Sequence, residues 1–400
     1  MSQPNMPPLL MTSEPGTFAH NTLKVRVPAI LRDMIAANDF PADVLDALEA
    51  LHAELTGGRI RPLREKSADA LDWNARSAPY FGRTWLEVPW YWAEAYFYRR
   101  VLEATGYFRP GPLYGFDPFA TTKRKEWARD VAPAAVERLL AGLSGDMETR
   151  FEQLLHASLW GNRTDLSYTV AAHLGATAAP DQERTNLLVD DSAAVWKHIL
   201  AREGGRFGII ADNAGTELLM DAALADFLLS SDLASEIHLH LKPQPFYVSD
   251  AMISDLANGT DALIEAGGSA GRLGRRIDAH VSAGDLCPQT HAFYCSGLFY
   301  EEMPADLRVA LGTLDLVIIK GDANYRRLVG DAHWPPTTSF IETTAHFPAP
   351  LVALRTFKSE LIVGLAPGQA ERAAAEDSHW LVNGIRGVIQ ANLEPKSDLG

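Results

Sequence analysis

The stretch RFGIIADNAGTELLMD, Arg206 to Asp221, joins the pattern of a buried strand to that of the helix after it. Phe207 to Ala211 is a short apolar run with two β-branched isoleucines, which is typical of a buried strand in a parallel sheet. A leucine-rich run at helical spacing follows Gly215. Asp212 and Asn213 therefore come at the carboxyl end of a strand, where open α/β sheets bind their ligands.

Asp212 and Asn213 offer two adjacent side-chain oxygen donors, which suit a hard cation such as Mg²⁺ or Mn²⁺. Asp and Asn are also favoured as helix N-caps and in Asx turns, so the pair alone does not establish a metal site. The choice depends on the residues downstream.

The remainder of the carboxyl-terminal half alternates between apolar runs and helical spacing. A helix is predicted over 216–230 and another from about residue 254. Because strands separated by helices imply right-handed crossovers, we expect a parallel sheet covered on both faces. Further strands are predicted at 236–241, 291–296, 314–320 and 351–356.

The amino-terminal half, from about Thr22 to Gly145, shows helical spacing of its apolar residues. Its most unusual stretch is the aromatic segment Trp85 to Phe108, which is typical of a core helix. Glu94 lies within this segment, and a carboxylate among aromatic rings needs either a cationic partner or a ligand. We expect a leader over residues 1–22, a mainly helical region covering the site over 23–190, and an α/β domain over 191–400.

Composition excludes several classes of function. The 47% hydrophobic and 22% charged fractions are those of a soluble globular protein, and no apolar run approaches the roughly 18 residues of a membrane span. The amino terminus has no basic region followed by an apolar core, so no secretory signal is expected. Two cysteines favour a reducing cytoplasm, and a net charge of −15 opposes nucleic-acid binding.

Polar residues follow the predicted strands in unusual number. Asp250 follows the second strand, the stretch 320–327 (KGDANYRR) follows the fourth, and 355–358 (RTFK) follows the last. If the sheet is parallel, these ends share one edge with Asp212. The acidic and amide residues would suit a divalent cation, and the lysines and arginines would suit a phosphate. Ordinary turns and caps explain the spacing equally well.

Two other patterns are weaker. The stretch 267–271 (GGSAG) matches the G-x-S-x-G nucleophile pattern, but it follows a helix rather than a strand. We expect a flexible glycine-rich loop there, with Arg272, Arg275 and Arg276 solvated. The histidines show no zinc-type spacing.

Taken together, these motifs resemble the damage-control phosphatase family, in its sugar-phosphate phosphatase branch. The resemblance is carried by DNAGTE at 212–217, FYVSD ending at Asp250, KGDANYRRLVGD at 320–331 and LRTFK ending at Lys358. The aromatic helix, the loop SLWGNRTDLS at 158–167 and the terminal WLVNGIRGVIQ at 380–390 extend it over nearly the whole chain.

The resemblance implies a three-layer α/β/α sandwich with a mainly parallel sheet, an N-terminal helical region, and a phosphatase that depends on Mn²⁺, Co²⁺ or Ni²⁺, with Mg²⁺ also possible. The implied metal ligands are Asp212, Asn213 and Asp250, and both aspartates are the implied catalytic residues. The implied substrate-binding residues are Asp322, Asn324, Tyr325, Arg326 and Lys358, supported by Lys320 and Arg355.

Small sugar phosphates of the fructose 1-phosphate or fructose 6-phosphate type are the leading substrate hypothesis, in a role of metabolite damage control. We expect the N-terminal helices to cover the site and bring Glu94, Asn162 and Asp165 over it. The alternative for Glu94 is an ion pair with an arginine such as Arg99. Two other functions stay open: a protein-glutamate carboxyl methyltransferase that uses S-adenosylmethionine, and a sugar-phosphate binder without turnover.

Overall fold

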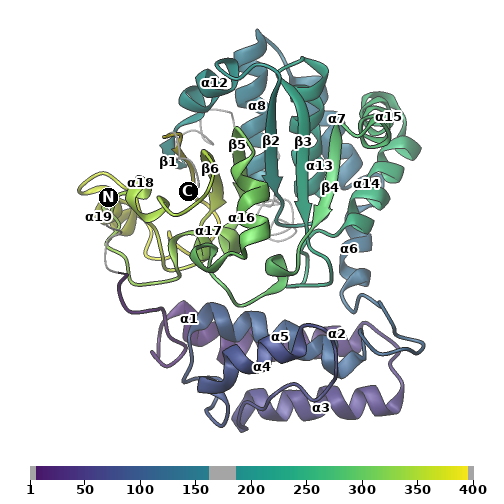
Figure 1. Ribbon diagram of the computed structural model, residues 1–400, viewed down its shortest axis with the longest axis vertical. Helices are drawn as coiled ribbons and strands as arrows, with labels where there is room; N and C mark the ends of the chain where they lie inside the picture. Colours follow the sequence, from purple (N-terminus) through teal and green to yellow (C-terminus); the bar gives the residue numbers. More distant parts are fainter. Residues whose placement is uncertain (1–5, 162–185, 395–400) are drawn as a thin grey trace.

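The structure is a computed structural model that describes residues 6–161 and 186–394. Its centre is a seven-stranded sheet with helices on both faces, and a layer of helices lies across one end of the strands (Figure 1). The strands are β1 (Leu187–Asp190), β2 (Gly205–Ile210), β3 (Ala234–Leu241), β4 (Leu286–Thr290), β5 (Leu316–Lys320), β6 (Leu351–Thr356) and β7 (Gly387–Asn392).

The strand order places the ends of β2 and β5 at the centre of the sheet. The order is β1-β7-β6-β5-β2-β3-β4. The five strands from β4 to β6 run parallel, whereas β7 is antiparallel to β6 and pairs in parallel with β1. After β2 the chain continues to β3 and β4 on one side of the sheet, and after β5 it continues to β6 and β7 on the other. A topological switch point therefore lies between β2 and β5. The expected mainly parallel sheet is confirmed.

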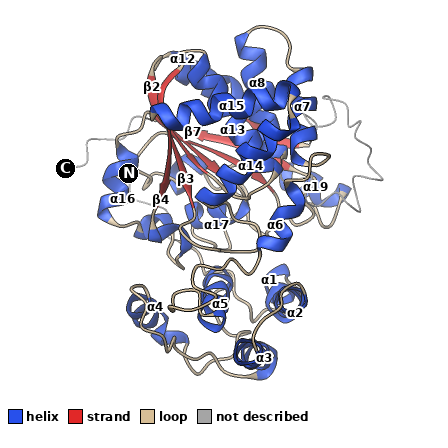
Figure 2. Cartoon of the chain, turned by 90° about the vertical axis from the view of Figure 1, so that its right-hand side faces the viewer, coloured by secondary structure: helices blue, strands red, loops and turns tan. Residues whose placement is uncertain are grey.

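Each face of the sheet has its own hydrophobic cluster, because successive side chains of a strand point to opposite faces. In β5, Leu316 and Ile318 belong to one cluster, and Val317 and Ile319 belong to the other. Figure 2 shows the strands lying between the resulting helical layers. The first face is covered by α7 (Ala132–Gly142), α8 (Met147–Trp160), α12 (Ser192–Leu200), α13 (Thr216–Ser230), α14 (Ile253–Ala266) and α15 (Gly268–Ala283). The second is covered by α16 (Ala305–Gly312), α17 (Asp322–Val329), α18 (Phe340–Thr343) and α19 (Gln369–Glu376).

Helix α13 is the most enclosed helix of the first face. All but two of its fifteen residues are buried. It packs against α8, α7, α14 and α15 as well as β3. Its first turn follows Asp212 and Asn213 directly, so the packing of α13 fixes one side of the candidate site.

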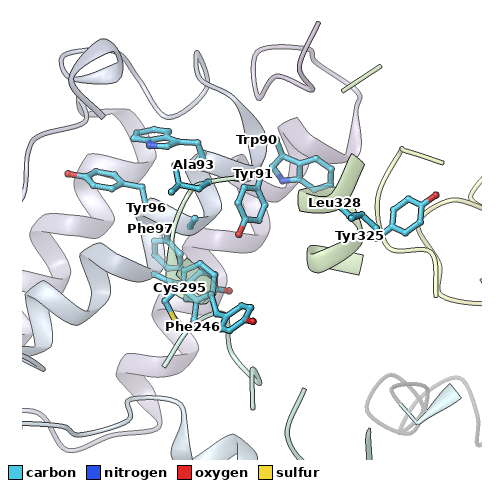
Figure 3. Packing of buried hydrophobic residues seen from close by; sticks show 14 of the residues in the cluster. Trp90, Tyr91, Ala93, Tyr96, Phe97, Phe246, Cys295, Tyr325 and Leu328 are labelled. Carbon is cyan, nitrogen blue, oxygen red and sulfur yellow. The ribbon is translucent and has the colours of Figure 1, made fainter. Parts of the chain in front are cut away.

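The layer across the strand ends is formed by the first five helices and a π-helical turn between two of them. It is joined to the second face of the sheet by one continuous hydrophobic cluster. In that cluster, Trp90, Tyr91 and other side chains of the aromatic helix share the core with Tyr325 and Leu328 of α17 (Figure 3). The elements are α1 (Phe18–Asn21), the π-helix η1 (Thr22–Arg26), α2 (Val27–Ala36), α3 (Ala42–Gly57), α4 (Ala70–Ser77) and α5 (Trp90–Thr105), and α6 (Ala120–Glu126) follows on the way to the sheet.

The covering layer is shorter than the 23–190 region expected from the sequence. Helices α7 and α8 pack on α13, and β1 pairs with β7, so all three belong to the sandwich. The expected leader is in contact with the rest of the chain from Met6 onward: Leu10 N donates to Asp331 O at 2.9 Å, and Thr12 N donates to Val88 O at 3.0 Å. We therefore propose residues 18–105 as the layer that covers the site.

Two local expectations were wrong. The stretch 291–296 is a 3₁₀-helix, η3 (Ala292–Cys295), and the strand lies just before it at β4. Its apolar side chains are buried because they reach the second-face cluster, and the proline in β4 is tolerated because β4 is an edge strand. The glycines at 267–271 form the junction of α14 and α15 instead of a loop, whereas Arg272, Arg275 and Arg276 are exposed as expected. No helix in the described ranges is long and apolar enough to cross a membrane.

Candidate active site

The loops after β2 and β3 meet at the switch point and bring Asp212, Asn213 and Asp250 together. Asn213 and Asp250 form an isolated antiparallel bridge. The backbone N–H of Ala251 donates to Asp212 O at 2.8 Å, which ties the second loop to the first. The three residues proposed as metal ligands from the sequence are therefore neighbours in space.

The Asn213 amide is held on both sides. Its Nδ2 donates to Asp212 Oδ2 at 2.8 Å and to Glu217 Oε2 at 3.0 Å. Its Oδ1 accepts a hydrogen bond from Ser249 Oγ at 2.6 Å. These contacts join the β2 loop, the first turn of α13 and the β3 loop.

Both aspartates are buried and incompletely neutralised. Burial raises the pKa of Asp212 well above its usual value, and the negative charges of Glu217 and Asp250 raise it further, against Lys242 and Lys358. Burial also raises the pKa of Asp250 to about 6, against Lys242 and other cations. Asp250 Oδ2 lies 3.3 Å from Lys242 Nζ but has no hydrogen-bond partner among the described residues.

Lys320, which we expected to support phosphate binding, is committed elsewhere. Its ammonium group is fully buried and donates to Ser158 O at 2.8 Å, Glu217 Oε1 at 2.9 Å and Asp221 Oδ1 at 2.7 Å. A buried lysine needs such acceptors, because the cost of removing its charge from water is large. Lys320 is therefore a partner of buried carboxylates, and we no longer assign it to the phosphate.

The buried acids at the switch point outnumber the buried cations. Four carboxylates face two ammonium groups there. A third buried lysine, Lys123, pairs with two further acids, Asp117 and Asp255. If all four carboxylates ionise, two negative charges remain in a region of low dielectric, where they repel strongly. The four acids are Asp212, Glu217, Asp221 and Asp250, and the two cations are Lys242 and Lys320.

The first turn of α17 contributes Asp322 to the same edge. Asp322 Oδ1 accepts hydrogen bonds from Arg355 Nε at 2.8 Å, Ser359 Oγ at 2.9 Å and the backbone N–H of Lys358 at 3.2 Å. Arg355 is fully buried, so we assign it to holding Asp322 and not to the phosphate contact expected from the sequence.

Two other predicted substrate residues on α17 point into the protein. Tyr325 is fully buried, and its hydroxyl donates to Gln390 Oε1 at 2.8 Å. Asn324 Nδ2 donates to the carbonyl of Lys320 at 2.9 Å, and its Oδ1 accepts from Tyr300 at 3.3 Å. Both side chains therefore support the turn between β5 and α17 from its buried side.

Arg326, also expected to bind phosphate, joins α17 to the covering layer. Its guanidinium contacts Glu94 Oε2 at 2.6 Å and Asp331 Oδ1 at 2.7 Å, and lies 3.5 Å from the centre of the Trp90 ring. Glu94 thus has an arginine partner, as one of our two interpretations required, but the partner is Arg326. Glu94 Oε2 also accepts a hydrogen bond from Tyr247 at 3.4 Å, and Tyr247 belongs to the β3 loop that carries Asp250.

Lys358 is the predicted cation that keeps partial exposure at this edge. Its charge opposes the rise in the pKa of Asp212, which places it within electrostatic reach of the aspartate. Asn162 and Asp165, expected over the site, lie outside the described residues.

Sequence reasoning missed Glu217, Asp221, Lys242 and Lys123. Asp221 follows Glu217 by four residues, so both lie on one face of α13, and Asn213 precedes the helix by three residues. This spacing was available in the motif DNAGTELLMD. The two lysines carried no such signal, because their partners come from other loops.

A separate group of candidate metal donors lies on α8 and β1. One donor atom from each of Glu152, His156 and Asp190 falls within 4.8 Å of the others. It shares no residue with the Asp212 site, and β1 is at the far edge of the sheet from β2. His156 lies 3.6 Å from Asp190, which is consistent with a partly exposed ion pair.

Comparison with known proteins places this site in a family. The family model of the damage-control phosphatase ARMT1-like domain matches residues 22–373, which include every described site residue from Glu94 to Lys358. The chain belongs to the ARMT1-like damage-control phosphatase family. The family resemblance expected from the motifs is therefore confirmed.

Curated relatives of this damage-control phosphatase match over almost their whole length. Damage-control phosphatase ARMT1 of Mus musculus is 33% identical, with 96% of this chain and 98% of the relative covered. The Homo sapiens protein of the same name is 30% identical over the same shares. A crystal structure of a DUF89 family protein from Pyrococcus horikoshii is 15% identical with a TM-score of 0.48, and covers 92% of this chain and 98% of that one.

Gly321 provides a test of how closely the β5 turn approaches Asp212. Its φ is +85°, and a Cβ added there would lie 2.0 Å from Asp212 Oδ2. Gly267 has a similar backbone conformation, with φ +76°, but a Cβ there would meet nothing within 4 Å. Gly267→Ala should therefore lower the free energy of unfolding through backbone strain alone, by about 1–3 kcal/mol.

In Gly321→Ala the free energy of unfolding should fall by this amount and by a further ~1–3 kcal/mol, because the new Cβ clashes with Asp212. Urea denaturation of both variants beside the wild type measures the difference. Equal losses in the two variants would contradict a tight contact between Gly321 and Asp212.

Proposed function

We propose that this damage-control phosphatase hydrolyses small sugar phosphates of the fructose 1-phosphate or fructose 6-phosphate type, with a divalent cation held by Asp212, Asn213 and Asp250. The observation that carries the proposal is the excess of buried carboxylates over lysines at the switch point of the sheet. Two of these negative charges lack a buried cationic partner, and one divalent cation would neutralise them. Buried charges are tolerated when they are paired or when they coordinate a metal.

The donor set fits such an ion. Two carboxylates and one amide oxygen are hard ligands, which suit Mg²⁺ or Mn²⁺, and Co²⁺ and Ni²⁺ accept the same oxygens. Asp250 Oδ2 is buried with the Lys242 ammonium 3.3 Å away and no hydrogen bond within the described residues, so it keeps acceptor capacity for a cation. In the group Glu152, His156 and Asp190, Asp190 ends β1, which runs opposite to β6, so this group lies at the other edge of the sheet from Asp212.

The residues around the cation have distinct roles in this proposal. The bound ion would polarise a phosphoryl oxygen and neutralise its charge. Lys358 would add a point charge to the phosphate from the opposite side. Asp322 is fixed by Arg355 and Ser359, so it presents a rigid acceptor beside Lys358.

The covering layer would provide the contacts to the sugar. Arg326 holds the Glu94 carboxylate from one side, and Tyr247 donates to it from another. A carboxylate has further acceptor positions, which suit sugar hydroxyl groups. We propose that Glu94 accepts hydrogen bonds from these hydroxyls and that Arg326 positions Glu94 instead of contacting the phosphate.

The two cysteines are free, in keeping with the proposed cytoplasmic location.

The central test is metal-dependent release of phosphate. A screen of sugar phosphates with Mn²⁺, Co²⁺, Ni²⁺ or Mg²⁺ should show turnover that chelation abolishes. Asp212→Asn and Asp250→Asn should each reduce turnover by roughly a hundredfold or more, because the amide keeps an oxygen but lacks the negative charge that compensates the cation.

Near-normal turnover in either folded variant would contradict the proposed ligands. Saturable binding of fructose 1-phosphate without turnover for any metal would favour a non-catalytic binder. Calorimetric binding of S-adenosylmethionine would favour the methyltransferase.

Lys358→Ala should weaken substrate capture. Loss of one charge-assisted contact costs about 1.5–3 kcal/mol, which corresponds to a rise in KM of roughly 10- to 150-fold. The affinity for Mn²⁺ should change much less, because Lys358 faces the phosphate. Lys197→Ala, which removes an exposed lysine of α12, is the matched control and should alter neither quantity. An unchanged KM in Lys358→Ala would contradict the proposed contact between Lys358 and the phosphate.

Metal affinity should depend on pH. The raised pKa values mean that Asp212 and Asp250 hold protons at mildly acidic pH, and these protons compete with the cation. Because the pKa of Asp250 is about 6, the Kd for Mn²⁺ should fall as the pH rises through this value and then level off. Calorimetric titrations between pH 5.5 and 8 measure the profile. A Kd independent of pH would show that these carboxylates are not the ligands.

A further inference from the structure

The orientation of the Asn213 amide is decided by its neighbours. Its Nδ2 lies 2.8 Å from Asp212 Oδ2 and 3.0 Å from Glu217 Oε2, and its Oδ1 lies 2.6 Å from Ser249 Oγ. Carboxylate oxygens accept hydrogen bonds, whereas a hydroxyl can donate. The NH₂ group therefore faces the two acids, and the amide oxygen faces the loop that carries Asp250.

Glu217 is itself held in place from behind. Its Oε1 accepts a hydrogen bond from Lys320 Nζ at 2.9 Å, while its Oε2 accepts from Asn213. Lys320 is anchored in turn by Ser158 O and Asp221 Oδ1, and both Lys320 and Glu217 are almost completely buried. A glutamate fixed at both oxygens cannot turn away from Asn213.

We propose that Glu217, held by Lys320, is a positioning residue that keeps the amide oxygen of Asn213 turned toward the cation. This inference rests on the proposed function, because it requires Asn213 to be a metal ligand. An amide oxygen is a good ligand for a hard cation, whereas the NH₂ group offers only hydrogens. A flip of the amide would replace a ligand with a donor and leave the cation with two protein ligands.

Asp221 separates this role from a simple charge effect. It accepts a hydrogen bond from the same lysine, at 2.7 Å, and is as deeply buried as Glu217. It also accepts a hydrogen bond from Ser158 Oγ, at 2.6 Å, and no hydrogen bond between described residues joins it to Asn213. Glu217→Gln and Asp221→Asn therefore remove the same charge from the same lysine, but only Glu217→Gln alters the contact with Asn213.

The experiment measures the Kd for Mn²⁺ alone by calorimetry, on the full chain at pH 8. In Glu217→Gln, the remaining amide oxygen should pair with the Lys320 ammonium, because that hydrogen bond is charge-assisted. The new NH₂ group then faces the NH₂ of Asn213 and favours the flipped amide. We expect the affinity for Mn²⁺ to fall 10- to 100-fold, as is typical when a partner of a metal ligand is lost. In Asp221→Asn it should stay within roughly threefold of the wild type.

A second substitution should restore binding. A carboxylate at position 213 presents an acceptor oxygen in either orientation, so it needs no positioning partner. Asn213→Asp in the Glu217→Gln background should therefore bring the Kd for Mn²⁺ back to within roughly threefold of the wild type. The urea midpoint without metal shows that each variant is folded, and a purely structural role of Glu217 would not produce this rescue.

Three results would overturn the inference: a wild-type Kd in Glu217→Gln, an equal loss in Asp221→Asn, or no recovery in the double variant. Failure of the proposed function looks different. In that case the wild type itself does not bind Mn²⁺, or Asp212→Asn binds it as tightly as the wild type.

Discussion

The buried guanidinium of Arg326 is the constraint on which the architecture depends. It lies between Glu94 of the covering layer and Asp331 after α17, with its flat face on Trp90. Asp331 also accepts from the backbone N–H of Tyr91, and its carbonyl accepts from Leu10. Three segments distant in sequence therefore meet at one cation. Breaking a buried pair by removing one partner leaves an uncompensated charge, so each segment depends on the others being in place.

The pairing of buried charges also matters for the second cluster of acids, which lies at the ends of β2 and β5. Around Arg326 one guanidinium faces the carboxylates of Glu94 and Asp331. At the ends of β2 and β5 the lysines pair with only part of the carboxylates, and burial, together with the neighbouring negative charges, raises the pKa values of Asp212 and Asp250. Both clusters hold more carboxylates than cations, and the larger excess lies at the strand ends, where we propose the cation.

The parallel sheet and the neighbouring positions of Asp212, Asn213 and Asp250 could be predicted because they follow from local patterns and one topological rule. The roles of the cations could not. Lys320, Arg326 and Arg355 look alike in the sequence, but each is buried against a carboxylate that only the fold brings near. The segment 291–296 was misread as a strand because burial and extended structure produce the same short apolar run. The arginine that pairs with Glu94 is Arg326 and not the expected Arg99. This pair could not be predicted from local spacing, because the two residues are 232 positions apart in sequence.

The enclosure of α13 has a consequence for how the molecule assembles. A helix with no solvent-facing side gains little by forming alone, since its stability comes from the surfaces that enclose it. Those surfaces come from α7 and α8 before it and from α14, α15 and β3 after it. The first turn of α13, which carries Glu217, can therefore become ordered only when segments from both sides of it in sequence have docked. A truncated or partly folded chain would lack the site altogether instead of holding a weakened version of it.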